Sequence, residues 1–323
     1  DWFVNWADFP SVVGFNDHLL SFYLKKSDKE TFSYDIFLRQ SNDYGKHWTI
    51  ENKLHSDTTK SEHGFVSMTP SGADSFFISW LDGRNTKSMG HDHAQHDSGG
   101  AMQIRIAEVM SNGDIKNEYK LDSRTCDCCQ TSMAMTDDGP IVVYRDRSDQ
   151  EIRDIYYAKY KNGIWSESKP VFQDNWMING CPVNGPKVAV QENVVAVAWF
   201  TAADNIPRVR LSFSKDKGEH FFPPIEINQG KAIGRVDLLM LDQNTALISW
   251  MESTEEKALL KIAKVRSSGE IEKIITVGEI SAARSTGFPQ MELVENQICF
   301  AWNRLENDQK KIEAFSLLLK DLN

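Results

Sequence analysis

The chain has 323 residues and carries 46 acidic against 36 basic side chains, which gives a formal net charge of −10. This acidic balance is spread along the chain, so it favours solubility and argues against a nucleic-acid partner, whose phosphates require a basic patch. No apolar run approaches the ~20 residues needed to span a bilayer. Because the chain starts at Asp1 and not at Met, we expect a processed, exported protein, periplasmic or extracellular. We also expect a monomer.

In chain order, the first predicted element is a short strand over residues 1–6. Six pairs of apolar segments follow, and each pair is joined by a turn rich in Gly, Asp, Asn or Glu, as hairpins require. The second segment of each pair is apolar and then turns polar abruptly, which is typical of a buried strand that enters a loop. Each second segment carries one of six aromatic residues that recur at intervals of 51 to 64 residues: Tyr23, Trp80, Tyr144, Trp199, Trp250 and Trp302.

This period is too long for a helical solenoid and suits a four-stranded antiparallel sheet, the blade of a β-propeller. Residues 106–115 and 262–271 (IAEVMSNGDI and IAKVRSSGEI) are near copies, as a repeat predicts. The sequence therefore predicts an all-β, six-bladed β-propeller with four-stranded antiparallel blades, as a single domain over residues 1–323. The last blade has no fourth strand of its own, so we expect residues 1–6 to pair with it and close the ring.

Two polar turns, at residues 41–48 and 214–221, fit the pattern S-x-D-x-G-x-x-[W/F]. In such a turn the Asp accepts N–H bonds, the Gly takes a positive φ and the aromatic packs between strands. The pattern resembles the Asp box of sialidases and their BNR-repeat relatives, although the Arg-Ile-Pro motif of the catalytic sialidases is missing. The resemblance implies a structural role for eight residues: Ser41, Asp43, Gly45, Trp48, Ser214, Asp216, Gly218 and Phe221.

Alternate loops of a propeller lie on opposite faces, and the inter-blade links share one face with the loops between strands two and three. In the family that the chain resembles, this face holds a central pocket for an anionic sugar. Converging arginines would bind a carboxylate or sulfate there, although a salt-bridged rim is the alternative for them, and a structural histidine is the alternative for His63. The candidate catalytic residues are Asp82, Arg145, Arg235 and Glu151, and the candidate substrate-binding residues are Arg84, Arg124, Arg147, Arg284 and His63.

Four of the five cysteines fall in two consecutive inter-blade links, which a ring makes neighbours: Cys126, Cys128, Cys129 and Cys181. Three interpretations stay open for them. They can pair as disulfides in an oxidising compartment, bind Cu(I) or Zn(II) as thiolates, or remain reduced thiols under the rim.

The long loop of the second blade contains His91, His93 and His96. Imidazoles at such short spacings suit Cu(II), Ni(II) or Zn(II), and the alternative is a solvated polar loop.

Three functions therefore compete. The first, favoured by the resemblance, is a sialidase-like exported protein that binds or hydrolyses an anionic glycan; as an enzyme it would be a glycoside hydrolase. The second is a propeller that binds copper or zinc through its cysteines and histidines. The third is a protein-interaction platform without chemistry, because a fold does not fix a function.

Overall fold

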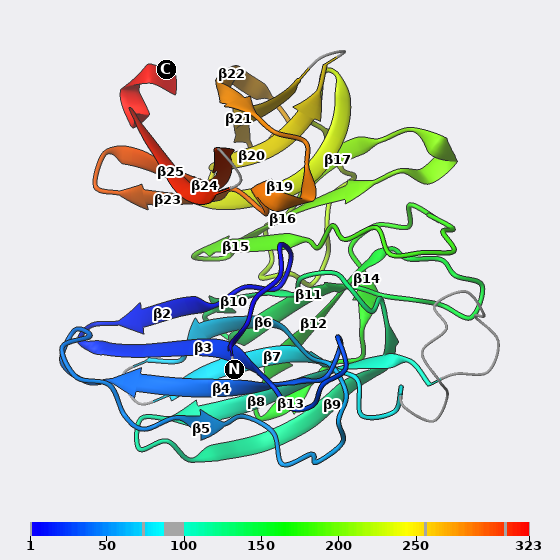
Figure 1. The fold of residues 1–323 in the computed structure, drawn as a ribbon. Coiled ribbons are helices and arrows are strands. Elements are labelled where there is room, and N and C mark those ends of the chain that lie inside the picture. Colours follow the sequence, from blue (N-terminus) through cyan, green and yellow to red (C-terminus); the bar gives the residue numbers. More distant parts are fainter. Residues whose placement is uncertain (1, 73–74, 87–99, 255–256, 307–308, 323) are drawn as a thin grey trace.

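The computed structural model describes residues 2–72, 75–86, 100–254, 257–306 and 309–322 and consists of six antiparallel sheets (Figure 1). Within each sheet the strands pair in chain order, as the hairpin pattern predicts, apart from two strands of two residues each, one at the N-terminus and one at the end of the third sheet. The first three sheets contain β2 (Ser11–Phe15), β3 (His18–Lys26), β4 (Tyr34–Ser41) and β5 (Asn52–Lys53); β6 (His63–Pro70), β7 (Ser75–Asp82), β8 (Met102–Met110) and β9 (Ile115–Thr125); and β10 (Ser132–Thr136), β11 (Gly139–Arg145), β12 (Ile155–Lys161), β13 (Ile164–Trp165) and β14 (Lys169–Pro170).

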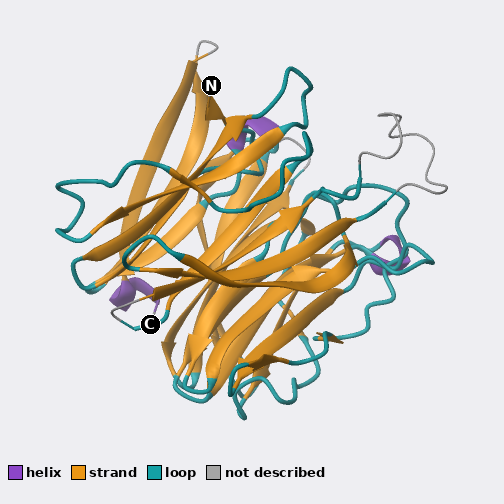
Figure 2. Cartoon of the chain, turned by 90° about the horizontal axis from the view of Figure 1, so that it is seen from below, coloured by secondary structure: helices purple, strands orange, loops and turns teal. Residues whose placement is uncertain are grey.

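The last three sheets follow the same plan, except that the sixth has three strands, as expected. They contain β15 (Lys187–Gln191), β16 (Val194–Thr201), β17 (Arg208–Ser214) and β18 (Ile225–Glu226); β19 (Lys231–Asp242), β20 (Thr245–Ser253), β21 (Ala258–Arg266) and β22 (Ile271–Ile280); and β23 (Gln290–Val294), β24 (Gln297–Glu306) and β25 (Gln309–Leu318). Figure 2 shows how little other regular structure the described chain has: only the 3-10 turns η1 (Ala203–Asn205), η2 (Arg284–Thr286) and η3 (Leu319–Leu322). None of the described helices has the length and apolar character needed to cross a membrane.

The innermost strands explain why the sheets become blades of a propeller. β2, β6, β10, β15 and β19 each contact the innermost strand of the next sheet along the chain, the last of these contacts being with β23. Five hydrophobic clusters fill the spaces between successive blades. The second strand of a blade is covered on both faces, and all eight residues of β16 are accordingly buried. The six-bladed propeller predicted from the sequence is thus confirmed.

The recurring aromatic residue has a second repeated function, which is to donate a hydrogen bond to a carboxylate. Five of the six do so, and the acceptor comes from the same blade or from the preceding one. A buried indole or phenol needs such a partner, because its polar atom would otherwise lose hydration without compensation. The donor and acceptor pairs are Tyr23 with Glu51, Trp80 with Asp82 (3.0 Å), Tyr144 with Asp122 (2.6 Å), Trp199 with Asp174 (2.7 Å) and Trp250 with Glu252 (2.8 Å).

The predicted pairing of residues 1–6 with the last blade is wrong. β1 (Trp2–Phe3) pairs instead with β3 of the first blade, where Trp2 lies opposite Lys25 and Phe3 opposite Leu24. The reason is that β2 covers only the first half of β3, from His18 to Phe22, so the second half offers β1 a free edge.

Side-chain stacking, not strand pairing, links the N-terminal segment to the sixth blade. Trp6 stacks on Phe288 with ring centroids 5.8 Å apart, while Arg235 and Arg284 lie over the Trp6 ring. In Figure 1 this segment, in dark blue, runs from the first blade toward the upper half of the molecule.

The two Asp-box turns have the same hydrogen bonds in the first and fourth blades. Ser41 Oγ accepts from the Gly45 amide (2.9 Å) while Asp43 accepts from the His47 amide (2.9 Å). Residues 214–221 repeat these contacts at 2.8 and 3.0 Å. The glycines have φ values of 82° and 80°, a region in which a side chain is strained. Both turns join the third strand to the fourth, so they lie at the end of the blade opposite the inter-blade links.

Candidate functional site

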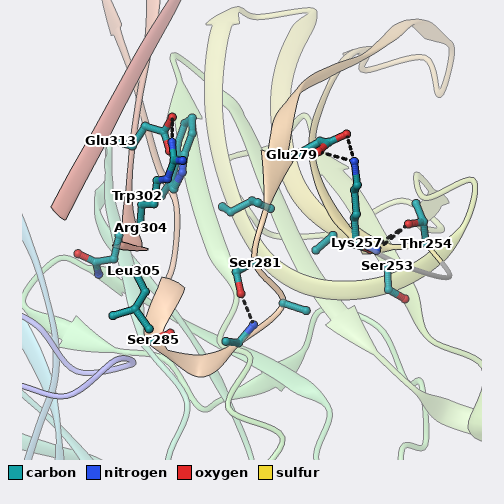
Figure 3. A pocket seen from close by; sticks show the side chains of 15 residues that line it. Ser253, Thr254, Lys257, Glu279, Ser281, Ser285, Trp302, Arg304, Leu305 and Glu313 are labelled. Atoms are coloured by element: carbon teal, nitrogen blue, oxygen red, sulfur yellow. Dashed lines mark hydrogen bonds and ion pairs between the residues drawn. The ribbon is translucent and has the colours of Figure 1, made fainter. Parts of the chain in front are cut away.

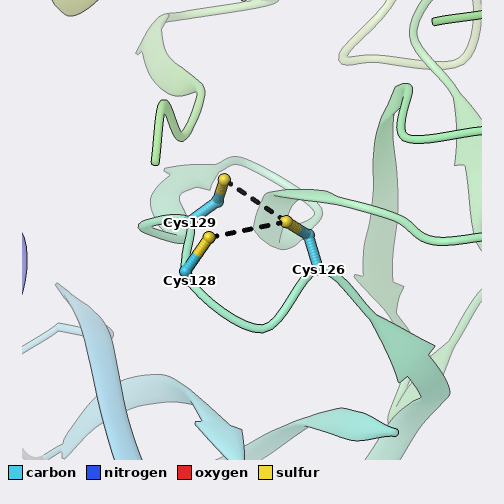
Figure 4. Close-up of side chains that lie close together, drawn as sticks. All are labelled: Cys126, Cys128 and Cys129. Carbon is cyan, nitrogen blue, oxygen red and sulfur yellow. Dashed lines mark hydrogen bonds between the residues drawn. The ribbon is translucent and has the colours of Figure 1, made fainter. Parts of the chain in front are cut away.

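A cluster of thiols lies where the link between the second and third blades turns. Cys126 Sγ is 3.5 Å from Cys129 Sγ and 4.0 Å from Cys128 Sγ, and all three sulfur atoms lie within 4.8 Å of one another. Figure 4 shows the three side chains directed toward one another. Cys181, an exposed cysteine of the next link, lies outside this group of three but near enough to Cys128 for that thiol to lower its pKa. The structure thus brings together three of the four cysteines that the sequence singles out, with the fourth nearby.

Backbone contacts hold the two cysteine links together. The Cys126 amide donates to the Arg145 carbonyl (3.0 Å), which fixes the end of β9 against β11. The Gln130 side chain then accepts from the Gly185 amide (3.1 Å) and donates to the Ala7 carbonyl (2.7 Å). Gly185 passes so close to Gln130 that a Cβ would lie 2.2 Å from the Gln130 carbonyl oxygen. Glycine is therefore required there for the link that carries Cys181 to approach.

A buried arginine supplies positive charge to the cluster. Arg153 is fully buried, and its Nη1 donates to Cys126 Sγ at 3.3 Å. Burial alone would raise the pKa of Cys126, but its hydrogen bonds with Cys128 and Cys129 and the charge of Arg153 bring it well below its ordinary value. The hydrogen bond from Cys128 likewise lowers the pKa of Cys181. The hydrogen bond with Cys126 raises the pKa of Cys128, and burial raises that of Cys129. The pKa values within the cluster are thus shifted in opposite directions, downward for Cys126 and Cys181 and upward for Cys128 and Cys129.

Carboxyl groups border the thiols on the side of the N-terminal segment. Burial raises the pKa of Glu62 to about 8 and that of Asp8 to about 7, and it also raises the pKa of Asp127. The Tyr34 hydroxyl donates to Glu62 and, at 3.4 Å, to Asp8. The charges of Asp127 and Cys181 contribute to the raised pKa of Glu62, so these acids and the thiols lie in one region of the face.

Two predicted site arginines, Arg145 and Arg235, are held by backbone carbonyls. Arg145 is buried and donates to the carbonyls of Arg153 (2.6 Å), Phe200 (2.7 Å) and Asn184 (2.8 Å). Arg235 donates to those of Gly287 (2.8 Å), Ala283 (3.1 Å) and Ala282 (3.3 Å), and burial lowers its pKa to about 10. Both guanidinium groups therefore tie neighbouring links together.

Most other predicted ionic residues pair with one another. Glu151 accepts from Arg147 (2.8 Å) and Arg153 (2.7 Å) and lies 3.4 Å from Arg124. Arg84 binds both oxygens of Asp82, at 2.8 and 2.7 Å. Burial opposes ionisation of both acids, but their arginine partners outweigh it and lower the pKa of Asp82 and Glu151 to about 2. Both carboxyls are thus ionised at neutral pH, which does not suit a general acid. Arg284 remains over Trp6, apart from these pairs.

His63 lies in a buried cage between the first two blades. Its ring stacks on His55 with centroids 3.8 Å apart, its Nε2 contacts Asp57 (2.9 Å), and its Nδ1 contacts the carbonyls of Tyr34 and Ser61 (3.2 Å each). Asp35 Oδ1 lies 3.5 Å from His55 Nε2. Although these groups are close enough for a metal ion, both nitrogens of His63 already face oxygen acceptors. The arrangement therefore fits a structural histidine better than a ligand.

Sequence reasoning missed four residues near the face: Asp8, Asp35, His55 and Glu62. His55 and Asp35 belong to segments that carry no motif, and only the chain path brings them together. Glu62 precedes His63 in an inter-blade link, and no motif marks it. His91, His93 and His96 lie outside the described residues.

These features define a class: a six-bladed β-propeller with a thiol cluster between two adjacent links. Among solved structures the chain is similar to a Hadza microbial sialidase, Hz136 (TM-score 0.60, 13% identity, 97% of this chain and 66% of that chain), and to the NanB sialidase of Streptococcus pneumoniae (0.61, 10%, 98% and 68%). It is also similar to the α-L-arabinanase of Penicillium chrysogenum complexed with arabinobiose (0.59, 11%, 99% and 96%).

The chain therefore has the fold of sialidases and arabinanases, as the Asp-box resemblance implied. It spans about two thirds of the length of the two sialidase chains. No family model and no curated protein matches its sequence.

Proposed function

We propose that this propeller binds a soft metal ion, Cu(I) or Zn(II), through Cys126, Cys128, Cys129 and Cys181. The observation that carries the proposal is the convergence of the Cys126, Cys128 and Cys129 sulfur atoms within 4.8 Å, and Cys181 of the next link is the nearby candidate for a fourth ligand. Sulfur ligands about 2.3 Å from one tetrahedral or trigonal metal lie about 3.8 to 4.0 Å apart. The distances of 3.5 and 4.0 Å from Cys126 require only small side-chain adjustments to reach that spacing.

Charge balance supports the same ligands. Three thiolates on Cu(I), or four on Zn(II), leave an excess of two negative charges, and buried negative charge needs a nearby cation. Arg153, which is fully buried, donates directly to Cys126 and supplies such a cation. A structural role for reduced thiols alone would not need a cation at the sulfur.

Elemental analysis of protein purified without a His-tag or chelator tests the proposal. We expect about one equivalent of copper or zinc per chain, lost in Cys126→Ser and retained in Cys299→Ser. Cys299 is the matched control because it is a half-buried thiol in β24 of the sixth blade. Native protein that is metal-free and cannot be loaded after reduction, or that keeps its metal in Cys126→Ser, would refute the proposal. Rim cysteines found in disulfides in the native protein would favour the oxidised alternative.

A second candidate is binding of an anionic carbohydrate on the face that carries the inter-blade links. Its support is the fold shared with sialidases and an arabinanase and the partly exposed Arg124 at that face. A glycan array and a fluorogenic sialoside assay test it, with Arg124→Met as the variant. Hydrolysis would require Asp82 or Glu151 to leave its arginine partner. Silence in both assays would exclude this candidate. If the protein also held no metal, the interaction platform would be the remaining function.

A further inference from the structure

A cavity lies between the fifth and sixth blades, whereas the thiols lie between the second and third. Its volume is about 900 Å³, within the range of small-molecule sites. Lys257 and Glu279 form one wall, and Trp302, Arg304 and Glu313 form the other (Figure 3). Hydroxyl and amide groups lie between the walls, from Ser253, Ser281, Ser285 and Asn303.

At this cavity the repeat of the propeller is broken. In the five other blades the recurring aromatic donates to a carboxylate, whereas Trp302 has no hydrogen-bond acceptor among the described residues. Trp80 and Trp250 find their acceptor two residues further on, at Asp82 and Glu252. The equivalent position after Trp302 is Arg304, so an acid is replaced by a cation. The sixth blade therefore leaves an indole N–H unpaired beside a cation.

We infer that the cavity binds the carboxylate of an acidic sugar, a uronic acid unit of an oligosaccharide. The carboxylate would take the place that Asp82 and Glu252 occupy in their blades, accepting from Trp302 Nε1 and from Arg304. The pairs Lys257–Glu279 (2.7 Å) and Arg304–Glu313 (3.5 Å) are largely exposed, and such surface pairs hold their cations weakly. A ligand carboxylate can therefore displace Glu313 at small cost.

The lining favours a sugar over an acidic peptide. Hydroxyl and amide groups suit the many hydroxyls of a saccharide, and apolar side chains such as Trp302, Leu305 and Ile280 can pack against the C–H faces of its rings. The inference does not depend on the metal proposal, and it places carbohydrate between the fifth and sixth blades, at the links and loops that line the cavity there.

Calorimetric titration of the full chain with trigalacturonate tests this site, with the methyl-esterified trisaccharide as the neutral comparison. We expect trigalacturonate to bind and the ester to bind at least about tenfold more weakly, the loss typical of a charge-assisted hydrogen bond. Arg304→Glu restores the acid of the repeat and should abolish binding. Trp302→Phe keeps the ring, removes the N–H and should weaken binding several-fold.

Arg266→Glu is the matched control, since Arg266 is an exposed arginine of β21 that does not line the cavity. It should bind as the unmodified chain does, and metal content should be unchanged in every variant. Arg304→Gln, a milder change, should also weaken binding and guards against misfolding of Arg304→Glu. Absence of binding, equal binding of the ester, or unaltered binding by Arg304→Glu would overturn the inference. Binding of a tetraglutamate peptide as tight as that of trigalacturonate would overturn the assignment to a sugar.

Discussion

The arginines and the cysteines of the same face are engaged very differently by the protein. Arg145 and Arg235 are surrounded by backbone carbonyls of neighbouring links, so their charge and donors are already used. The thiols contact mainly one another and Arg153. A side chain whose hydrogen-bonding groups are all paired within the fold stabilises the ring. A side chain whose ligand atoms have no strong partner in the protein can bind a metal ion or another ligand. Structural and functional residues should therefore differ in how much their substitution changes the free energy of unfolding.

The largest effect is expected for Arg145→Met. The substitution leaves the carbonyls of Arg153, Asn184 and Phe200 buried without their donor, and each loss costs about 1–3 kcal/mol. We expect urea denaturation to show a loss of about 4 kcal/mol. Arg124→Met is the control: the ion pairs described for Arg124 are long (3.4 Å) and partly exposed, and the change should stay within about 0.5 kcal/mol. Equal effects of the two substitutions would contradict the structural role of Arg145.

The next effect concerns pH, because the N-terminal segment is held by buried acids. Burial raises the pKa of Asp8 to about 7 and that of Glu62 to about 8. Between about pH 4 and 8 the unfolded chain has lost these protons while the folded chain retains them, so stability falls as pH rises through this window. The pKa shift of Asp8 alone corresponds to a loss of at most about 4 kcal/mol in the free energy of unfolding across this window. We expect a loss of about 3 kcal/mol, because the structure around a buried charge relaxes.

Asp8→Asn tests this linkage, since the amide oxygen can still accept from the Phe65 amide, which lies 3.0 Å from Asp8 Oδ1. Unfolding measured at several pH values should show a flatter profile in Asp8→Asn and again in Glu62→Gln. A profile unchanged by both substitutions would assign the pH dependence to other groups.

The sequence alone was sufficient for the fold because the repeat is local. Trp80, Trp199 and Trp250 each lie in an apolar strand with its own turn, and a strand buried on both faces reveals itself in five to ten residues. The position of β1 was missed because it depends on which half of β3 is left uncovered, a register that composition does not reveal.

The candidate site could be predicted only in part. Consecutive links of a ring are neighbours, so Cys126 and Cys181 could be brought together without coordinates. The carbonyl partners of Arg145 could not be predicted, because every residue has a carbonyl group and the sequence does not mark which of them converge. His55 and Asp35 were invisible for the same reason, since each meets His63 only through the path of the first blade.

A smaller effect is expected in the turns that resemble Asp boxes. Gly218 has a φ of 80°, and an added Cβ would lie 2.9 Å from Ile141 Cδ1. Gly163, at a φ of 86°, has no atom within 4 Å of that position. Gly163→Ala should cost about 1 kcal/mol through backbone strain alone, and Gly218→Ala about 2 kcal/mol because a contact is added. Thermal unfolding of the two variants should preserve this order, and a reversed order would show that the packing of Ile141 does not matter.

The smallest effect on stability is expected for Cys128→Ser. Cys128 is half-buried, and its sulfur contacts mainly other thiols, so exchanging sulfur for oxygen should change the free energy of unfolding by less than about 1 kcal/mol when no metal is bound. A metal ligand behaves differently once the ion is present, because binding to the folded state adds to its stability. Added Zn(II) should therefore raise the melting temperature of the unmodified chain but not that of Cys128→Ser. A large destabilisation of the metal-free variant would instead make the thiols, like the arginines, part of the structural framework.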